Sequence, residues 1–163
     1  MENEKEYISY MRKMIGHKRM MSVGLGCLII DEKGRVLLEK RTDNGKYCLP
    51  GGSINFDETV LEGLKREIRE ETDIEIKEAR LMMINSGKKQ ELVYPNGDVT
   101  DYVDLIFVSY VRSDEIHMRI TDGESSLLKF YSFDELPPEE EMLRGTYAPL
   151  MKYRSGNLDV LVD

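Results

Sequence analysis

GSINFDETVLEGLKREIREETDI, residues 52–74, combines a helical periodicity with a dense set of carboxylates. Its apolar side chains recur at helical spacing, which predicts a helix over roughly residues 58–72. They would form one stripe along that helix, made of Val60, Leu61, Leu64 and Ile68. The helix would follow the breaker cluster Leu49-Pro50-Gly51-Gly52, with Asp57 at its N-cap.

Three glutamates lie on the side of this helix that faces away from the apolar stripe. At roughly 100° of rotation per residue, Glu67, Glu70 and Glu71 share one small surface. Glu67 and Glu71 repel each other as an i,i+4 pair, and a bound cation would remove that cost. Oxygen-rich clusters suit hard cations such as Mg²⁺ or Mn²⁺. An ordinary solvated acidic face is the alternative interpretation of these three residues, and the glycine loop in front favours a metal and phosphate site.

The spacing of the whole segment resembles the Nudix box, whose family pattern is G-x5-E-x7-R-E-U-x-E-E-x-G-U, where U is a bulky aliphatic residue. The ninth specified position, a glycine in the family, is Asp73 here, a residue that tolerates a left-handed helix C-cap at modest cost. The resemblance extends over about residues 20–137 and implies an α/β (mixed α+β) fold, an alpha-beta-alpha sandwich with a mixed sheet. The positions that match the box are Gly52, Glu58, Arg66, Glu67, Ile68, Glu70, Glu71 and Ile74.

The resemblance also implies roles for these residues. Members of the family hydrolyse nucleoside diphosphates linked to another group. Glu67, Glu70 and Glu71 would be metal ligands together with the carbonyl of Gly51, and Glu58 would join through water or remain a first-turn acid. Arg66 would orient the glutamates. The general base is often supplied by a loop, and Glu124 is the candidate here, with Asp122, Glu115 and Glu71 as rivals.

Substrate contacts are less clearly marked in the sequence. Gly52 lies in a loop that lets backbone approach a ligand, and Arg41 could meet a phosphate or form a surface ion pair. Tyr47, Tyr94 and Tyr102 could stack on a nucleobase, although tyrosines at such positions also serve as packing residues.

The resulting hypothesis is a hydrolase dependent on Mg²⁺ or Mn²⁺ that cuts the phosphoanhydride of a nucleoside diphosphate derivative. ADP-ribose-like nucleotide sugars, nucleoside triphosphates and dinucleoside polyphosphates all remain open as substrates, because specificity lies outside the box. Two other classes compete: a non-catalytic module of the same fold that senses a nucleotide ligand, and a purely structural or cation-binding protein. The complete glutamate set argues against the sensing module, and the glycine loop with Glu58 argues against the structural protein.

Composition narrows the partners. The 163 residues suffice for one domain, and the formal net charge of −8 disfavours nucleic acid as a ligand. Cys27 and Cys48 lack metal-site spacing and are expected to be reduced core thiols, with a disulfide as the alternative. No signal peptide or membrane-length apolar run is visible, so a cytoplasmic location is expected. A homodimer is a possible assembly.

The rest of the chain predicts a single domain over residues 1–163, with an N-terminal helix in residues 2–16 that packs on its own domain or on a second subunit. The core would span residues 20–137, and a last helix would cover residues 146–154. The expected strands are residues 22–31, 35–41, 76–85, 101–112, 115–120 and 127–133.

Overall fold

The computed structural model describes residues 6–121 and 123–163. This part of the chain contains the helices α1 (Tyr7–Ile15), α2 (Val60–Thr72) and α3 (Tyr147–Arg154). Short 3-10 turns cover Lys88–Gln90 and Glu139–Glu141. The strands are β1 (Met20–Ile30), β2 (Val36–Arg41), β3 (Tyr47–Cys48), β4 (Gly51–Ser53), β5 (Arg80–Asn85), β6 (Glu91–Val93), β7 (Val99–Tyr110), β8 (Ser125–Tyr131) and β9 (Leu161–Val162).

All of these strands belong to one mixed sheet. The hydrogen-bonded path runs β3-β2-β1-β7-β5-β9, while β4 pairs with β1, β6 with β7 and β8 with β2. The long central strands β1 and β7 are parallel, in a register that runs from Met20↔Thr100 to Ile30↔Tyr110. β5 and β9 are also parallel, whereas the other pairs are antiparallel. The predicted mixed sheet is confirmed.

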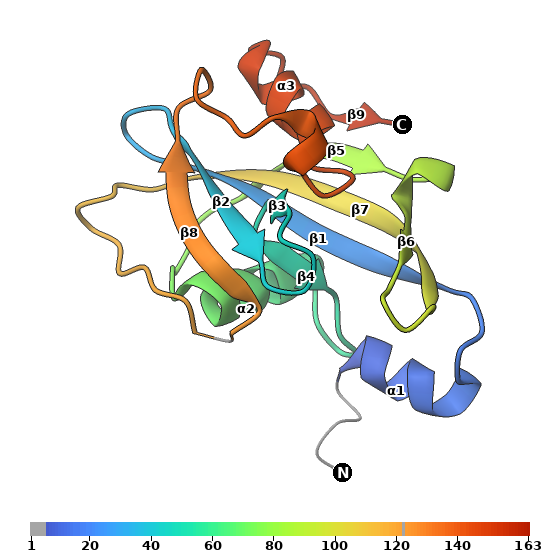
Figure 1. The fold of residues 1–163 in the computed structure, drawn as a ribbon. Coiled ribbons are helices and arrows are strands. Elements are labelled where there is room, and N and C mark those ends of the chain that lie inside the picture. Colours follow the sequence, from blue (N-terminus) through green and yellow to red (C-terminus); the bar gives the residue numbers. More distant parts are fainter. Residues whose placement is uncertain (1–5, 122) are drawn as a thin grey trace.

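Helices cover the two faces of the sheet, with α2 on one side and α3 on the other (Figure 1). Along β1, Cys27 and Ile29 pack into the cluster that contains α2, while Leu28 and Ile30 pack into the cluster that contains Leu150 of α3. This period of two, with both sets buried, is what a central strand requires. The sandwich predicted from the sequence is confirmed.

The start of α2 differs from the prediction. The N-cap is Thr59, whose side chain accepts a hydrogen bond from the backbone N–H of Glu62, and Glu62 bonds back to Thr59 as a capping box. Asp57 cannot cap the helix because its backbone is left-handed, with φ 63°. The predicted apolar stripe wrongly included Leu61, because 45% of this residue is exposed. The signal for the true start, Thr-x-x-Glu, was present in the sequence.

Two strand predictions are corrected. Residues 115–120 form a turn and an irregular segment, and β5 begins at Arg80, so the predicted strand 76–85 is shortened. Ile76 nevertheless lies in the core, so its apolar character reflects burial in a loop.

Helix α1 packs on its own domain, beside the loop that joins β4 to α2 (Figure 1). The ring of Phe56 lies edge-on between Tyr7 and Tyr10, at centroid distances of 5.3 and 5.6 Å. The Arg12 guanidinium donates to the side chain of Thr100 and forms an ion pair with Asp98. The predicted helix starts later than expected, at Tyr7, and residues 2–5 lie outside the described part. No helix in the described ranges combines the length and the apolar character that crossing a membrane requires.

Asp73, which replaces the glycine of the Nudix pattern, is the C-cap of α2, and its conformation leads to a test. Asp73 adopts φ 60° and ψ 14°, the left-handed conformation that favours glycine, and its N–H donates to the carbonyl of Arg69. We expect Asp73→Ala to lower the free energy of unfolding by about 1 kcal/mol, because alanine tolerates this conformation poorly. Asp73→Gly is expected to retain wild-type stability, since it loses only exposed pairs with His117 and Arg119. Urea denaturation measures both, and equal losses in the two variants would contradict this account.

Candidate functional site

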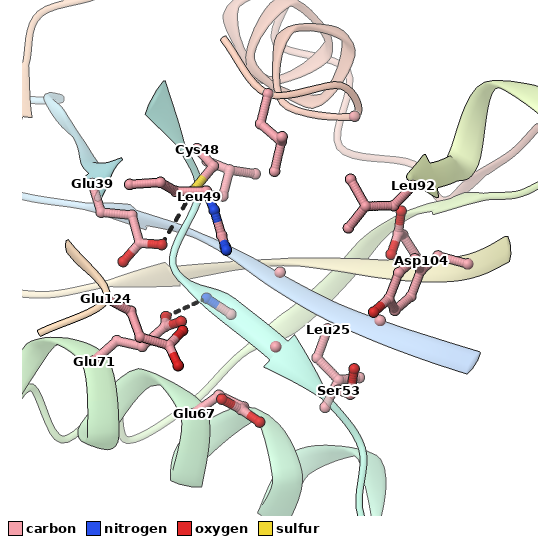
Figure 2. A pocket seen from close by; sticks show the side chains of 18 of the residues that line it. Leu25, Glu39, Cys48, Leu49, Ser53, Glu67, Glu71, Leu92, Asp104 and Glu124 are labelled. Carbon is pink, nitrogen blue, oxygen red and sulfur yellow. Dashed lines mark hydrogen bonds between the residues drawn. The ribbon is translucent and has the colours of Figure 1, made fainter. Parts of the chain in front are cut away.

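A cavity of about 880 Å³ opens where the glycine loop of β4 meets α2. Its walls come from segments far apart in the sequence: β1, β2, β4, α2, the β6 and β7 ribbon, the loop before β8, and residues 143–146. The first turn of α1 also contributes, through Glu6, Ile8 and Ser9. In Figure 2, Glu67, Glu71 and Glu124 lie on one side of this space, and Leu92 and Asp104 lie on the other.

Two glycines allow β4 to approach the helix closely. A Cβ at Gly51, whose φ is 154°, would come within 1.9 Å of the carbonyl oxygen of Leu25 in β1. The N–H of Gly51 then donates to the carboxylate of Glu71 at 2.7 Å. A Cβ at Gly52 would lie 2.4 Å from the carboxylate of Glu67. The loop and the carboxylates of α2 therefore form one continuous surface, which only glycine at these positions permits.

Arg66 holds the acidic side chains in place. Its guanidinium bonds to both carboxylate oxygens of Glu58, to Glu67 at 2.7 Å and to Glu70 at 3.2 Å. It also donates to the backbone carbonyl of Ser53 at 3.1 Å. These contacts use all five N–H groups that an arginine carries. Arg66 thus ties α2 to the glycine loop and fixes where two of the glutamates lie.

The carboxylates differ in their electrostatic surroundings. Burial raises the pKa of Glu67, and the neighbouring Arg66 partly opposes that shift. The hydrogen bonds from Arg66 lower the pKa of Glu58. Glu71 is 6% exposed, whereas the side chain of Glu70 is 58% exposed. The site therefore contains one buried glutamate, one partly buried glutamate and one exposed glutamate that Arg66 holds through a single hydrogen bond.

The donor set fits a hard divalent cation in chemistry. Glu67, Glu70, Glu71 and Gly51 line one cavity, and their oxygens are the ligand type that Mg²⁺ and Mn²⁺ prefer. As the side chains lie, no three carboxylate, histidine or cysteine groups of the described residues converge closely enough to hold an ion. Glu70, held at present by Arg66, is the exposed member that could turn toward the other two.

Most of the residues predicted for the site come together in the cavity: Arg41, Gly51, Gly52, Arg66, Glu67, Glu70, Glu71, Tyr94 and Glu124. Two predicted residues do not line it. Glu58 faces Arg66 and the N–H of Asn55, so it supports the loop. Tyr47 packs edge-on against Tyr131 at a centroid distance of 6.0 Å, which makes it a packing residue.

Glu124 reaches the cavity because its loop is anchored to the end of β2. The N–H and the hydroxyl of Thr42 both donate to the backbone carbonyl of Glu124, at 2.8 and 2.9 Å. The neighbouring Arg41 lines the cavity too, but its guanidinium pairs with both oxygens of Asp43 at 2.9 Å. The surface ion pair considered for Arg41 is therefore present, and a phosphate would compete with Asp43 for it.

Tyr94 lines the cavity together with Tyr102, and their hydroxyls are 2.7 Å apart. Burial raises the pKa of the Tyr94 hydroxyl above its ordinary value. This mutual hydrogen bond holds the two rings at the end of the cavity remote from α2.

Several charged residues of the cavity were missed from the sequence, among them Glu39, Asp104 and Arg144. Glu39 is buried in β2, where it accepts hydrogen bonds from Cys48 and Ser125. Asp104 lies in β7 and Arg144 in the loop before α3. The sequence did carry a signal for Glu39 and Asp104, since each is an acid within an apolar run, residues 36–39 and 103–108. A charged residue in a strand that is expected to be buried indicates a role other than packing. Cys27 and Cys48 are buried free thiols, as expected.

Asp104 generates a prediction about stability. Burial raises the pKa of its carboxyl from 3.8 to about 6, with Arg144 opposing the shift. Between these pH values the folded state binds more protons than the unfolded state, so stability is lost as pH rises through the window. We expect Asp104→Asn to raise the free energy of unfolding at pH 7.5, by on the order of 1–3 kcal/mol, with little gain at pH 4.

Asp101 of the same strand is the matched control. It pairs with Arg19, which lowers its pKa, so Asp101→Asn should reduce stability at pH 7.5. Denaturant titration at the two pH values measures both variants. A loss of stability in Asp104→Asn at pH 7.5 would contradict the assignment of Asp104 as a half-buried carboxylate whose desolvation is only partly offset by Arg144.

Comparison with known proteins agrees with this geometry. The family model described as the NUDIX domain matches residues 20–153. The chain is 32% identical over 108 residues, 62% of this chain and 70% of the other, to a MutT-like protein of Streptomyces ambofaciens. It is 30% identical over 112 residues to an ADP-ribose pyrophosphatase of Methanocaldococcus jannaschii, in a match that spans 67% of this chain but only 61% of that relative.

A solved structure supports the same assignment. The MutT NUDIX hydrolase from Burkholderia pseudomallei superposes with a TM-score of 0.64 at 27% identity, covering 80% of this chain and 96% of that one. The family match includes the glycine loop, α2 and every strand from β1 to β8. The chain therefore belongs to the NUDIX family.

Proposed function

We propose that this protein is a divalent-metal-dependent hydrolase that cleaves the phosphoanhydride bond of a nucleoside diphosphate linked to another group. The observation that carries the proposal is the junction of β4 and α2, where Gly51, Gly52, Glu67, Glu70 and Glu71 line one cavity. This places backbone and carboxylate oxygens side by side in a space large enough for a nucleotide.

The chain's own residues supply the framework for this reaction. The hydrogen bond from Gly51 to Glu71 fixes the loop against the helix. Arg66 aligns Glu67 and Glu70 and is a positioning residue. A cation held by Glu67, Glu70, Glu71 and the Gly51 carbonyl, either Mg²⁺ or Mn²⁺, would neutralise the charge of the diphosphate and lower the pKa of a bound water.

Glu124 is our candidate for the general base. It lines the cavity on the same side as Glu67 and Glu71 (Figure 2), and Thr42 anchors its backbone at the end of β2. A general base has to lie within reach of the attacking water, and an anchored loop satisfies that requirement better than a free one. Glu71 is a weaker candidate because its carboxylate already accepts the N–H of Gly51.

The relatives' names support a nucleotide substrate. One is an ADP-ribose pyrophosphatase and another is a MutT-like protein. A nucleoside diphosphate sugar, or a nucleoside triphosphate, would place its diphosphate near α2 and its nucleoside toward Tyr94 and Tyr102.

Glu70→Gln tests the proposal most simply. The substitution keeps the size of the side chain and removes a charge, so we expect phosphate release to fall by at least about a hundredfold with a folded protein. The measurement is phosphate release, with coupled pyrophosphatase and phosphatase, across nucleotide sugars, dinucleoside polyphosphates and nucleoside triphosphates. Each compound is assayed with Mg²⁺, with Mn²⁺ and with chelator.

Glu75→Gln is the matched control, because Glu75 is an exposed acid just beyond the helix and pairs only loosely with Arg69. It should retain wild-type turnover. Undiminished turnover in Glu70→Gln, or turnover in chelator, would refute the proposed mechanism. Absence of turnover together with thermal stabilisation by a nucleotide would instead support a ligand-sensing module of the same fold.

A further inference from the structure

The end of the cavity remote from α2 is built on β1 and β7. Because these strands are parallel and in register, Gly24 lies beside Asp104 and Gly26 beside Ile106. A Cβ at Gly24 would come within 2.0 Å of the Asp104 carboxylate and 3.2 Å of the Tyr102 ring. The glycine therefore gives room to an acidic side chain inside the sheet. Figure 2 shows Asp104 beside Leu92, across the space from Glu71 and Glu124.

Asp104 has a charge that the described part of the protein does not satisfy. Its side chain is half-buried in the cavity wall, and no group among residues 6–121 and 123–163 forms a hydrogen bond or an ion pair with its carboxylate. Asp101, three residues earlier on β7, shows the usual alternative, since its two carboxylate oxygens accept hydrogen bonds from Nε and Nη2 of Arg19. A carboxylate that loses part of its hydration without gaining a hydrogen bond lowers stability, so its presence in the cavity wall needs a reason outside folding.

Arg144 lines the same cavity and likewise has no hydrogen-bond or ion-pair partner in the described part of the chain, although the charges of Asp104, Glu91 and Asp101 act on it through space. The two groups line one cavity, and their charges interact through space without direct contact. A carboxylate that only accepts and a guanidinium that only donates are therefore both available to a ligand between them.

The chemistry of that ligand follows from the pair. A phosphate suits Arg144 but is repelled by Asp104, and a sugar diol suits Asp104 while leaving Arg144 unused. A ring N–H beside a carbonyl group suits both, because the N–H donates to Asp104 and the carbonyl accepts from Arg144. The apolar side chains of Leu92 and Ile106, with the Tyr102 ring, flank the same end of the cavity and suit a planar ring.

We propose that Asp104 and Arg144 read the base of the nucleotide and select those with a ring N–H beside a carbonyl: guanine, hypoxanthine and uracil. Adenine and cytosine present a ring nitrogen that accepts at the corresponding position, which faces the Asp104 carboxylate unfavourably. This inference rests on the proposed function, because it assigns the base-binding end of the same cavity.

The test is calorimetric binding of GMP, IMP, UMP, AMP and CMP, which share one ribose and one phosphate. The wild-type protein should bind the first three about tenfold more tightly than AMP and CMP. Asp104→Asn should reverse the order, because an amide can donate to the ring nitrogen of adenine or cytosine and accept from its amino group. Arg144→Gln should weaken the first three and leave AMP and CMP unchanged.

Asp101→Asn is the control, on the same strand but paired with Arg19, and it should retain the wild-type order. Equal affinities, binding of none of the five, or an order that survives Asp104→Asn would overturn the inference. If the affinity differs between GMP and dGMP but not among the bases, Asp104 would be assigned to the ribose, and the inference would also be overturned. The five nucleoside monophosphates contain no phosphoanhydride bond, so their binding does not depend on hydrolysis. Selective binding of these ligands, together with no turnover in the phosphate-release assay, would refute only the proposed hydrolysis.

Discussion

The close approach of β4 to α2 is the constraint on which the site depends. Gly51 passes beside the backbone of β1, where a side chain would strike the Leu25 carbonyl, and its N–H reaches Glu71. Gly52 leaves the space that the Glu67 carboxylate occupies. Arg66 then spans the junction, bonding to the Ser53 carbonyl and to three glutamates. Since β4 is itself paired with β1, the sheet determines where the acidic face of the helix lies.

The cavity has two ends with different chemistry, and the sheet connects them. Near α2, carboxylates and backbone oxygens gather where a diphosphate and a cation would be held. At the far end, β7 contributes Tyr102 and Asp104 beside the bare backbone of Gly24. Both ends are built on the parallel pair β1 and β7, so under the proposed function this pair of strands would align the diphosphate with the base.

The acidic helix and its loop could be predicted because their information is local. Spacing alone places Glu67, Glu70 and Glu71 on one helix face, and the left-handed C-cap at Asp73 follows from its position after the last turn. Asp57 was wrongly assigned as the N-cap because its left-handed backbone depends on the path of the loop from β4. Asp104 and Arg144 escaped prediction for a different reason. Asp104 is marked locally as an acid within an apolar run, but its meeting with Arg144 depends on strand pairing and on a loop 40 residues farther along the chain.

The central claim, that the glycine loop makes room for the carboxylates that hold a cation, is tested most directly by Mn²⁺ binding to Gly52→Ala. The backbone at Gly52 is one that alanine adopts, so the fold should persist, while the added methyl group would occupy the space of the Glu67 carboxylate. Calorimetry should show at least about a tenfold loss of Mn²⁺ affinity, with an unchanged circular dichroism spectrum. Wild-type Mn²⁺ affinity in a folded Gly52→Ala protein would contradict the account.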